Sequence, residues 1–172
     1  MSKVITFSRV FPAYHPKKGQ PTHFVEKLWK SLGNLNYQWD LVKVLQVSDA
    51  LNVKMPYSEF DPKHHAIRSG NRWKVGDKFS PRVWSGKPYN SKQIIIAPDI
   101  TIVSVQKIEM DLNGIFSVDG KYLDEIHFLE LAKNDGLEFN DMVNWFMPNF
   151  DKPKEFKGQI ISWSKDIKYL FT

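Results

Sequence analysis

The apolar positions of this chain recur with the spacing of helices in some segments and of strands in others. Helical spacing marks three segments, which are residues 21–34, 124–133 and 139–146. In the second of these, Ile126, Leu129 and Ala132 form the apolar stripe that we expect to be buried. Residues 41–51 fit either a short helix or a strand, and the sequence leaves both interpretations open.

Strands are predicted where β-branched and aromatic residues gather between turn-forming ones. The predicted strands are residues 4–7, 78–84, 93–96, 100–110, 115–118, 121–123 and 156–163. Asp119-Gly120 joins two of them and is a strong signal for a two-residue hairpin turn. Residues 55–70 contain two prolines and are expected to be largely loop, leading into a short segment at residues 64–68. Strands of mixed length, with helices inserted rather than alternating, predict an α+β fold that resembles a barrel.

Strict alternation in residues 78–84 gives this predicted strand two different faces. One face carries Lys78, Ser80, Arg82 and Trp84. The other face carries Phe79, Pro81 and Val83. We expect the first face to be an exposed, basic surface of the strand and the second to meet the core.

The length of 172 residues fits one domain that can bury a sizeable core, and no repeat or linker divides the sequence. The chain contains no cysteine, which excludes disulfides, thiolate zinc sites and a cysteine nucleophile. The amino-terminal segment lacks the apolar run of a signal peptide, and no later segment approaches about eighteen consecutive apolar residues. We therefore expect a cytoplasmic protein without a membrane partner.

The positive charge of the chain is concentrated in one short segment. The sequence holds 24 lysines and arginines against 19 acids, a formal charge of +5. Residues 63–92 contain eight of these bases and one acid, so they carry +7, while the remainder of the chain carries −2. A clustered excess creates a local positive potential that attracts polyanions, which a scattered excess does not do.

The segment from Lys63 to Ser80 reads KHHAIRSGNRWKVGDKFS. It resembles the K-x-x-T-I-R … W/F-K-x-G-D signature of small ASCH-type proteins in the PUA-like superfamily. The order of elements is similar too, from a leading ITF strand and a helix to a helical pair and a closing FKGQIISW strand. The resemblance describes residues 1–172 as a single ASCH/PUA-like domain with an insertion at about residues 34–62.

The resemblance implies a fold and a class of ligand. The fold would be a small PUA-like mixed β-barrel with flanking helices. The implied function is a binding module for RNA or another single-stranded nucleic acid. Such a module could recognise a nucleoside-sized ligand, such as a modified or flipped nucleotide, in a basic cleft.

One bacterial branch of the family hydrolyses N4-acetylcytidine with a lysine, a threonine nucleophile and a glutamate. By resemblance, the lysine corresponds to Lys63, the threonine to Ala66, and the glutamate falls near Asp135. Because alanine has no nucleophilic atom, this mechanism does not carry over intact. The missing nucleophile favours a binding protein over an enzyme.

Twelve residues are candidates for contact with nucleic acid. They are Lys63, His64, His65, Arg68, Arg72, Trp73, Lys74, Lys78, Arg82, Trp84, Lys87 and Tyr89. The cations would bind phosphate, and the aromatic side chains would stack on bases. Other interpretations stay open, because Arg68 could form an internal ion pair and Trp73 could belong to the core.

The sequence leaves three alternative functions open. An amidohydrolase acting on an acylated nucleoside such as N4-acetylcytidine would use Lys63 and Asp135, with an activated water in place of the threonine. A weak nuclease would use His64 or His65 as its general acid or base. A protein-interaction module would direct its basic face to an acidic partner. Adjacent histidines rarely face one ion from a strand, so we expect neither a metal nor a cofactor.

Overall fold

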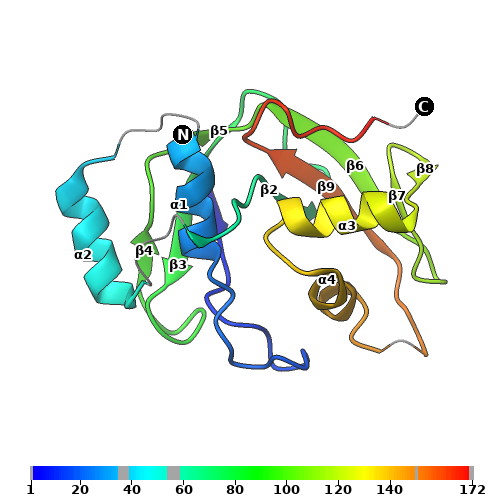
Figure 1. Cartoon of the computed structure of the whole chain (residues 1–172), viewed down its shortest axis with the longest axis horizontal. Helices are drawn as coiled ribbons and strands as arrows, with labels where there is room; N and C mark the ends of the chain where they lie inside the picture. The colour runs from blue at the N-terminus through cyan, green and yellow to red at the C-terminus, as the bar shows by residue number, and fades with distance from the viewer. Residues whose placement is uncertain (1, 35–38, 54–58, 150, 171–172) are drawn as a thin grey trace.

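The computed structural model describes residues 2–34, 39–53, 59–149 and 151–170 (Figure 1). These residues form four helices, α1 (Phe24–Asn34), α2 (Leu41–Leu51), α3 (Glu125–Asn134) and α4 (Phe139–Phe146). They also form nine strands, β1 (Lys3–Thr6), β2 (His65–Ser69), β3 (Lys78–Trp84), β4 (Gln93–Ile95), β5 (Ile100–Thr101), β6 (Ser104–Met110), β7 (Phe116–Val118), β8 (Lys121–Tyr122) and β9 (Phe156–Ser162). No helix within these residues is both long and apolar enough to cross a membrane.

The strands pair into two sheets, which confirms the predicted α+β fold. In the first sheet β3 is central, with β1 parallel to it and both β4 and β5 antiparallel to it. The second sheet is antiparallel and has the order β2-β9-β6-β7-β8. Among the described residues no strand pairing closes these sheets into a barrel, so the predicted barrel is not confirmed.

The chain passes from the first sheet to the second within the strand predicted at residues 100–110. The backbone N–H of Ile102 donates to the Asp77 carbonyl, next to the first sheet, at 2.9 Å. The N–H of the next residue, Val103, donates to the Ser162 carbonyl of the second sheet at 2.8 Å. The predicted strand is therefore divided into β5 and β6, one in each sheet.

One hairpin turn and the two caps of helix α2 follow directly from local sequence. Asp119 and Gly120 have φ angles of 49° and 81°, the left-handed pair that a tight hairpin between β7 and β8 requires. Residues 41–51 form a helix because Asp40 caps its start and Asn52, at φ 51°, ends it in the left-handed conformation. Helix α2 occupies part of the segment that we interpret as an insertion.

Helix α3 buries a different stripe from the predicted one. Ile126 and Leu129 are 75% and 56% exposed, whereas Phe128 and Leu131 are buried beside Ala132. The prediction was wrong because two apolar stripes, offset by two positions, run along this helix. Packing against Phe116, whose ring centroid lies 5.1 Å from that of Phe128, selects the second stripe.

The predicted basic face of β3 is exposed at only one of its positions. Lys78 is exposed, Arg82 and Trp84 are half-buried, and Ser80 is buried. Arg82 donates to the side chains of Ser80 and Gln93, and the ring of Trp84 packs against that of Tyr89, so neighbouring side chains cover part of this face. Figure 1 shows α1 and α2 on the side of the first sheet and α3 and α4 beside the second, so the start of β2 lies between the two halves.

Candidate functional site

The structure brings Lys63 and Asp135 together at the start of β2. The backbone N–H of Lys63 donates to the Lys27 carbonyl of α1 at 2.9 Å, and that of His64 donates to Asn134 at the end of α3 at 2.8 Å. These two bonds fix the β2 entry between helices from both halves of the molecule. As a result, Nζ of Lys63 lies 2.9 Å from Oδ1 of Asp135 and also donates to the Asp135 carbonyl.

Burial dominates the electrostatics of this ion pair. Both residues are almost entirely inaccessible, at 2% exposure for Lys63 and 7% for Asp135. Burial lowers the pKa of Lys63, and the charge of Asp135 opposes that effect. Burial by itself would raise the pKa of Asp135, but the neighbouring Lys63 charge and His65 hold that pKa below its usual value.

His65 completes the buried cluster from the core side. Its Nδ1 lies 3.3 Å from Oδ1 of Asp135, although the contact does not have the geometry of a hydrogen bond. Its Nε2 lies 2.8 Å from the Tyr169 hydroxyl. Burial lowers the pKa of His65, which favours the neutral imidazole. As a neutral ring, His65 therefore lies behind the ion pair.

The ion pair borders a small cavity of about 70 Å³, which we call the Lys63 cavity. Its walls include the rings of Phe7, Phe24 and Trp145, the methyl group of Ala66, and the guanidinium of Arg68. Nη2 of Arg68 donates to the Thr6 carbonyl at 2.9 Å, whereas the buried Nε has no hydrogen-bond partner among the described residues. The cavity thus combines two cations and one carboxylate with aromatic walls.

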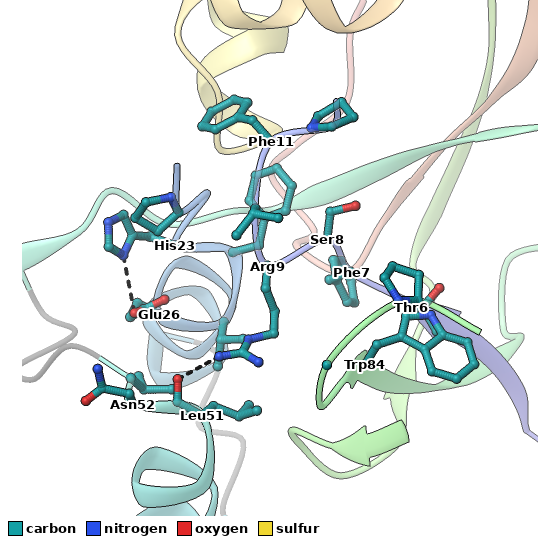
Figure 2. A pocket seen from close by; sticks show the side chains of 18 of the residues that line it. Thr6, Phe7, Ser8, Arg9, Phe11, His23, Glu26, Leu51, Asn52 and Trp84 are labelled. Atoms are coloured by element: carbon teal, nitrogen blue, oxygen red, sulfur yellow. Dashed lines mark hydrogen bonds and ion pairs between the residues drawn. The ribbon is translucent and has the colours of Figure 1, made fainter. Parts of the chain in front are cut away.

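A larger cavity of about 970 Å³, the Arg9 cavity, adjoins the Lys63 cavity (Figure 2). The two cavities share wall residues, among them Thr6, Phe7 and Phe24. Arg9 crosses the larger cavity and donates to the Leu51 carbonyl at 2.9 Å, as Figure 2 shows.

The rim of the Arg9 cavity is formed in part by aromatic side chains from the end of β3 and from the loop after it. Trp84 and Tyr89 both line the cavity. Their ring centroids lie 5.2 Å apart, and Tyr89 is 86% exposed. Two accessible rings at the mouth of a concave site form a surface on which a planar base can stack.

The twelve sequence-predicted contact residues separate into three groups. Lys63, Arg68, Trp84 and Tyr89 line the cavities. Exposed on the surface are Arg72, Lys74, Lys78 and Lys87, while His64 and Arg82 are half-buried. His65 and Trp73 lie in the interior. Four of the predicted residues therefore line the cavities, and six lie wholly or partly exposed outside them.

Trp73 and His65 do not fit the role of surface contacts. Trp73 is only 2% exposed and packs edge-on against Phe79, with ring centroids 6.3 Å apart. Lys3 and Arg72 lie over its ring at 5.0 and 4.9 Å, so cations cover what remains accessible. We correct the assignment for both residues, because neither side chain is accessible to stack on or bond to a base.

Several cavity residues were missed by the sequence analysis. Arg9 stands alone in FSRVF and carries no motif, while Phe24 belongs to the ordinary apolar pattern of its helix. Trp145 lies between the apolar positions that define α4. Their shared position arises from contacts between distant segments, and no local signal could have indicated it. Among the described residues, no group of three or more histidines and acids is arranged to hold a metal ion.

Comparison with known proteins does not identify a family, because no family model, curated protein or solved structure matches the chain. The similarity of residues 63–80 to the ASCH signature thus remains a prediction from the sequence.

Proposed function

We propose that this protein binds RNA or another single-stranded nucleic acid as an ASCH/PUA-like module and that its two sheets are a variant of the PUA-like barrel. The base of one unstacked nucleotide, modified or unmodified, would lie in the Arg9 cavity with its polar edge directed at the Lys63 cavity. Phosphate groups would contact the surrounding cations, and a neighbouring base would stack on Trp84 or Tyr89.

The observation that carries this proposal is the buried Lys63–Asp135 pair at the wall of a cavity. Removing two charges from water costs several kcal/mol per ion, and a hydrophobic pair of similar volume is often at least as stable. Charged groups that are buried beside a cavity are candidates for a functional site. Here Lys63, Asp135 and Arg68 border one small space with aromatic walls. This set of groups suits the polar edge and the flat face of a base.

The surface around the cavities supports a polyanionic ligand. The cations of residues 63–92 include five with exposed side chains, at Arg72, Lys74, Lys78, Lys87 and Lys92. Lys87 lies in the loop that follows Trp84, between Gly86 and Pro88, which line the Arg9 cavity. Exposed cations steer a polyanion toward the surface and give the binding a strong dependence on salt.

The test is a fluorescence-anisotropy titration with single-stranded RNA, single-stranded DNA and duplex DNA at low and at physiological salt. We expect salt-sensitive binding of a single strand and weaker binding of the duplex. The variant Ala66→Leu fills the Lys63 cavity without changing any charge, and we expect it to weaken binding by about tenfold or more, the order of one lost stacked base.

The matched control for this variant is Ala50→Leu, which adds the same group at an exposed position of α2. Circular dichroism verifies that both variants are folded, since overpacking costs about 1–3 kcal/mol. Absence of binding by the wild-type protein to all three ligands at low salt would overturn the proposal. Equal affinity of both variants would remove the Lys63 cavity from the binding site.

A second candidate function is hydrolysis of an acylated nucleoside. The observation that favours it is that Lys63, residue 66 and Asp135 border one cavity, as the resemblance to the N4-acetylcytidine amidohydrolases implies. Because Ala66 offers no nucleophile, the wild-type protein would have to hydrolyse N4-acetylcytidine with an activated water in place of the threonine. Incubation with N4-acetylcytidine, followed by chromatography, compares the wild type with Ala66→Thr. If neither protein releases cytidine, this candidate is excluded.

A further inference from the structure

A third cavity, of about 690 Å³, adjoins the Lys63 cavity and shares no wall residue with the Arg9 cavity. We call it the Lys152 cavity. It shares Ile67, Arg68, Trp145 and Phe146 with the Lys63 cavity, and its other walls include Tyr14, Lys152, Lys154 and Phe156. The Lys63 cavity thus shares one wall with each of the two larger cavities, which have different linings.

The three cavities carry cations along their whole length. Arg9 lies in the first, Lys63 and Arg68 in the second, and Lys152 and Lys154 in the third. The acids that line them are Glu26, which forms an ion pair with His23 at 3.3 Å, and Asp135, which is paired with Lys63. Arg9 and Glu26 balance each other in the Arg9 cavity, so the excess of positive charge lies in the Lys63 and Lys152 cavities.

Aromatic rings accompany the cations in each cavity. Trp84 and Tyr89 stand at the first and Phe156 at the third, whereas Phe7 and Phe24 at the second are buried, with Nζ of Lys63 4.4 Å from the ring centroid of Phe24. A groove of cations and aromatic rings is the arrangement by which proteins bind single strands, since every base has a face that can stack. A duplex keeps its bases stacked on one another, so their faces cannot enter concave cavities.

We propose that a single strand of nucleic acid runs from the Arg9 cavity, over the Lys63 cavity, into the Lys152 cavity. This inference rests on the proposed function and extends it, because it assigns a length of ligand and a second set of phosphate contacts. Arg68, shared by the last two cavities, contacts the strand at the central nucleotide. Lys152 and Lys154, which lie outside the basic segment of residues 63–92, contact phosphates on one side of it.

The experiment measures affinity for labelled single-stranded oligonucleotides of about one, three, six and twelve nucleotides, because grooves of this kind engage roughly 4–16 nucleotides. We expect affinity to rise with length and to level off once the strand spans all three cavities. Lys152→Glu/Lys154→Glu should weaken binding of the longest strand by about tenfold or more and leave the mononucleotide nearly unchanged. For this double variant, the plot of log K against log salt should be less steep by about 1.4, since each phosphate contact in a single strand contributes about 0.7 to the slope.

The matched control is Lys133→Glu/Lys165→Glu, which makes the same change of charge at two exposed lysines outside the three cavities. The inference is overturned if affinity does not depend on length beyond the mononucleotide, or if both double variants weaken binding equally. In either case the binding of a single nucleotide, and with it the proposed function, would stand. If no oligonucleotide and no mononucleotide binds, the proposed function fails as well.

Discussion

Lys63 and Asp135, which are 72 positions apart in the chain, form an ion pair of 2.9 Å that is almost completely buried. The relationship depends on the backbone bond from His64 to the Asn134 carbonyl, which holds the start of β2 against the end of α3. The pair borders the smallest of three adjoining cavities. The ion pair therefore serves both the contact between β2 and α3 and the lining of the Lys63 cavity.

Removal of the carboxylate should destabilise the fold strongly. We expect Asp135→Ala to lower the free energy of unfolding by about 3–5 kcal/mol, because Lys63 would remain as a buried charge without its partner. Urea denaturation measures the effect. The exposed Asp151→Ala serves as the control and should change stability by less than about 0.5 kcal/mol. A loss for Asp135→Ala as small as that of the control would mean that Lys63 gains water in place of the carboxylate.

The same carboxylate should make stability depend on pH in the acid range. The pKa of Asp135 in the folded protein lies below its value in the unfolded chain, which is about 3.9. A depressed pKa contributes stability that is complete above the unfolded value and is lost as pH falls through the folded value. We expect the wild-type protein to lose more stability than Asp135→Asn between about pH 5 and pH 2. Urea titrations at several pH values measure this difference.

His65 acts in the same direction and makes the comparison with a variant necessary. Burial lowers the pKa of His65 in the folded protein. The protein therefore also loses stability through His65 as pH falls below about 6.5, the pKa of histidine in the unfolded chain. The difference between the wild type and Asp135→Asn reports the carboxylate together with its effect on His65, because the Asp135 charge raises the pKa of His65. Parallel pH profiles for the two proteins would contradict the assigned pKa shift.

Local sequence signals predicted most of the fold. Asp119-Gly120 specified its turn because only a left-handed pair of residues closes so short a hairpin. The stripe of α3 was predicted wrongly, because the choice between Ile126 and Phe128 depends on which face meets the second sheet. The division of residues 100–110 into two strands was also beyond reach, since it reflects pairing with partners far along the chain.

The candidate site was only partly predictable for the same reason. Lys63 and Arg68 stand in a recognisable motif, and the resemblance indicated Asp135 as the partner of Lys63. Trp73 lies in that motif too, but its neighbours gave no indication of whether its ring faces the core. Arg9 reaches the site through contacts between segments that are remote in sequence, which no periodicity records.

The two aromatic residues at the rim should contribute to binding through stacking. We expect Trp84→Ala and Tyr89→Ala each to weaken binding of a single strand by about 1–3 kcal/mol per stacked base, that is by about 5- to 150-fold. Tyr122→Ala removes a ring of 70% exposure on β8, outside the cavities, and should have no effect. Anisotropy titrations of the three variants measure this. If Trp84→Ala and Tyr89→Ala bind as tightly as Tyr122→Ala, the bases stack elsewhere.

The cations of β3 and its loop should set the salt dependence of binding. Arg82 lies on β3 beside Thr6, a wall residue of two cavities, and Lys87 is exposed in the loop at the Arg9 cavity. We expect Arg82→Glu/Lys87→Glu to abolish binding at physiological salt and to flatten the plot of affinity against salt. Because Arg82 also donates to Gln93 at 3.2 Å, a thermal unfolding curve accompanies the titration. Unchanged affinity in a folded variant would exclude this surface from the binding site.

A glycine in β9 should be required for the position of Arg68. An added methyl group at Gly158 would collide with the Arg68 carbonyl of β2 and with the ring of Phe156. We expect Gly158→Ala to cost about 1–3 kcal/mol in unfolding free energy through overpacking, and to weaken binding because β2 carries Arg68 into the cavities.

Gly33→Ala is the matched control, since nothing lies within 4 Å of its added methyl group and the residue is helical. Alanine there should raise stability by up to about 1 kcal/mol and leave binding unchanged. Denaturation and anisotropy measured on the same samples separate the two effects, and a fully stable Gly158→Ala protein would show that β2 and β9 can move apart.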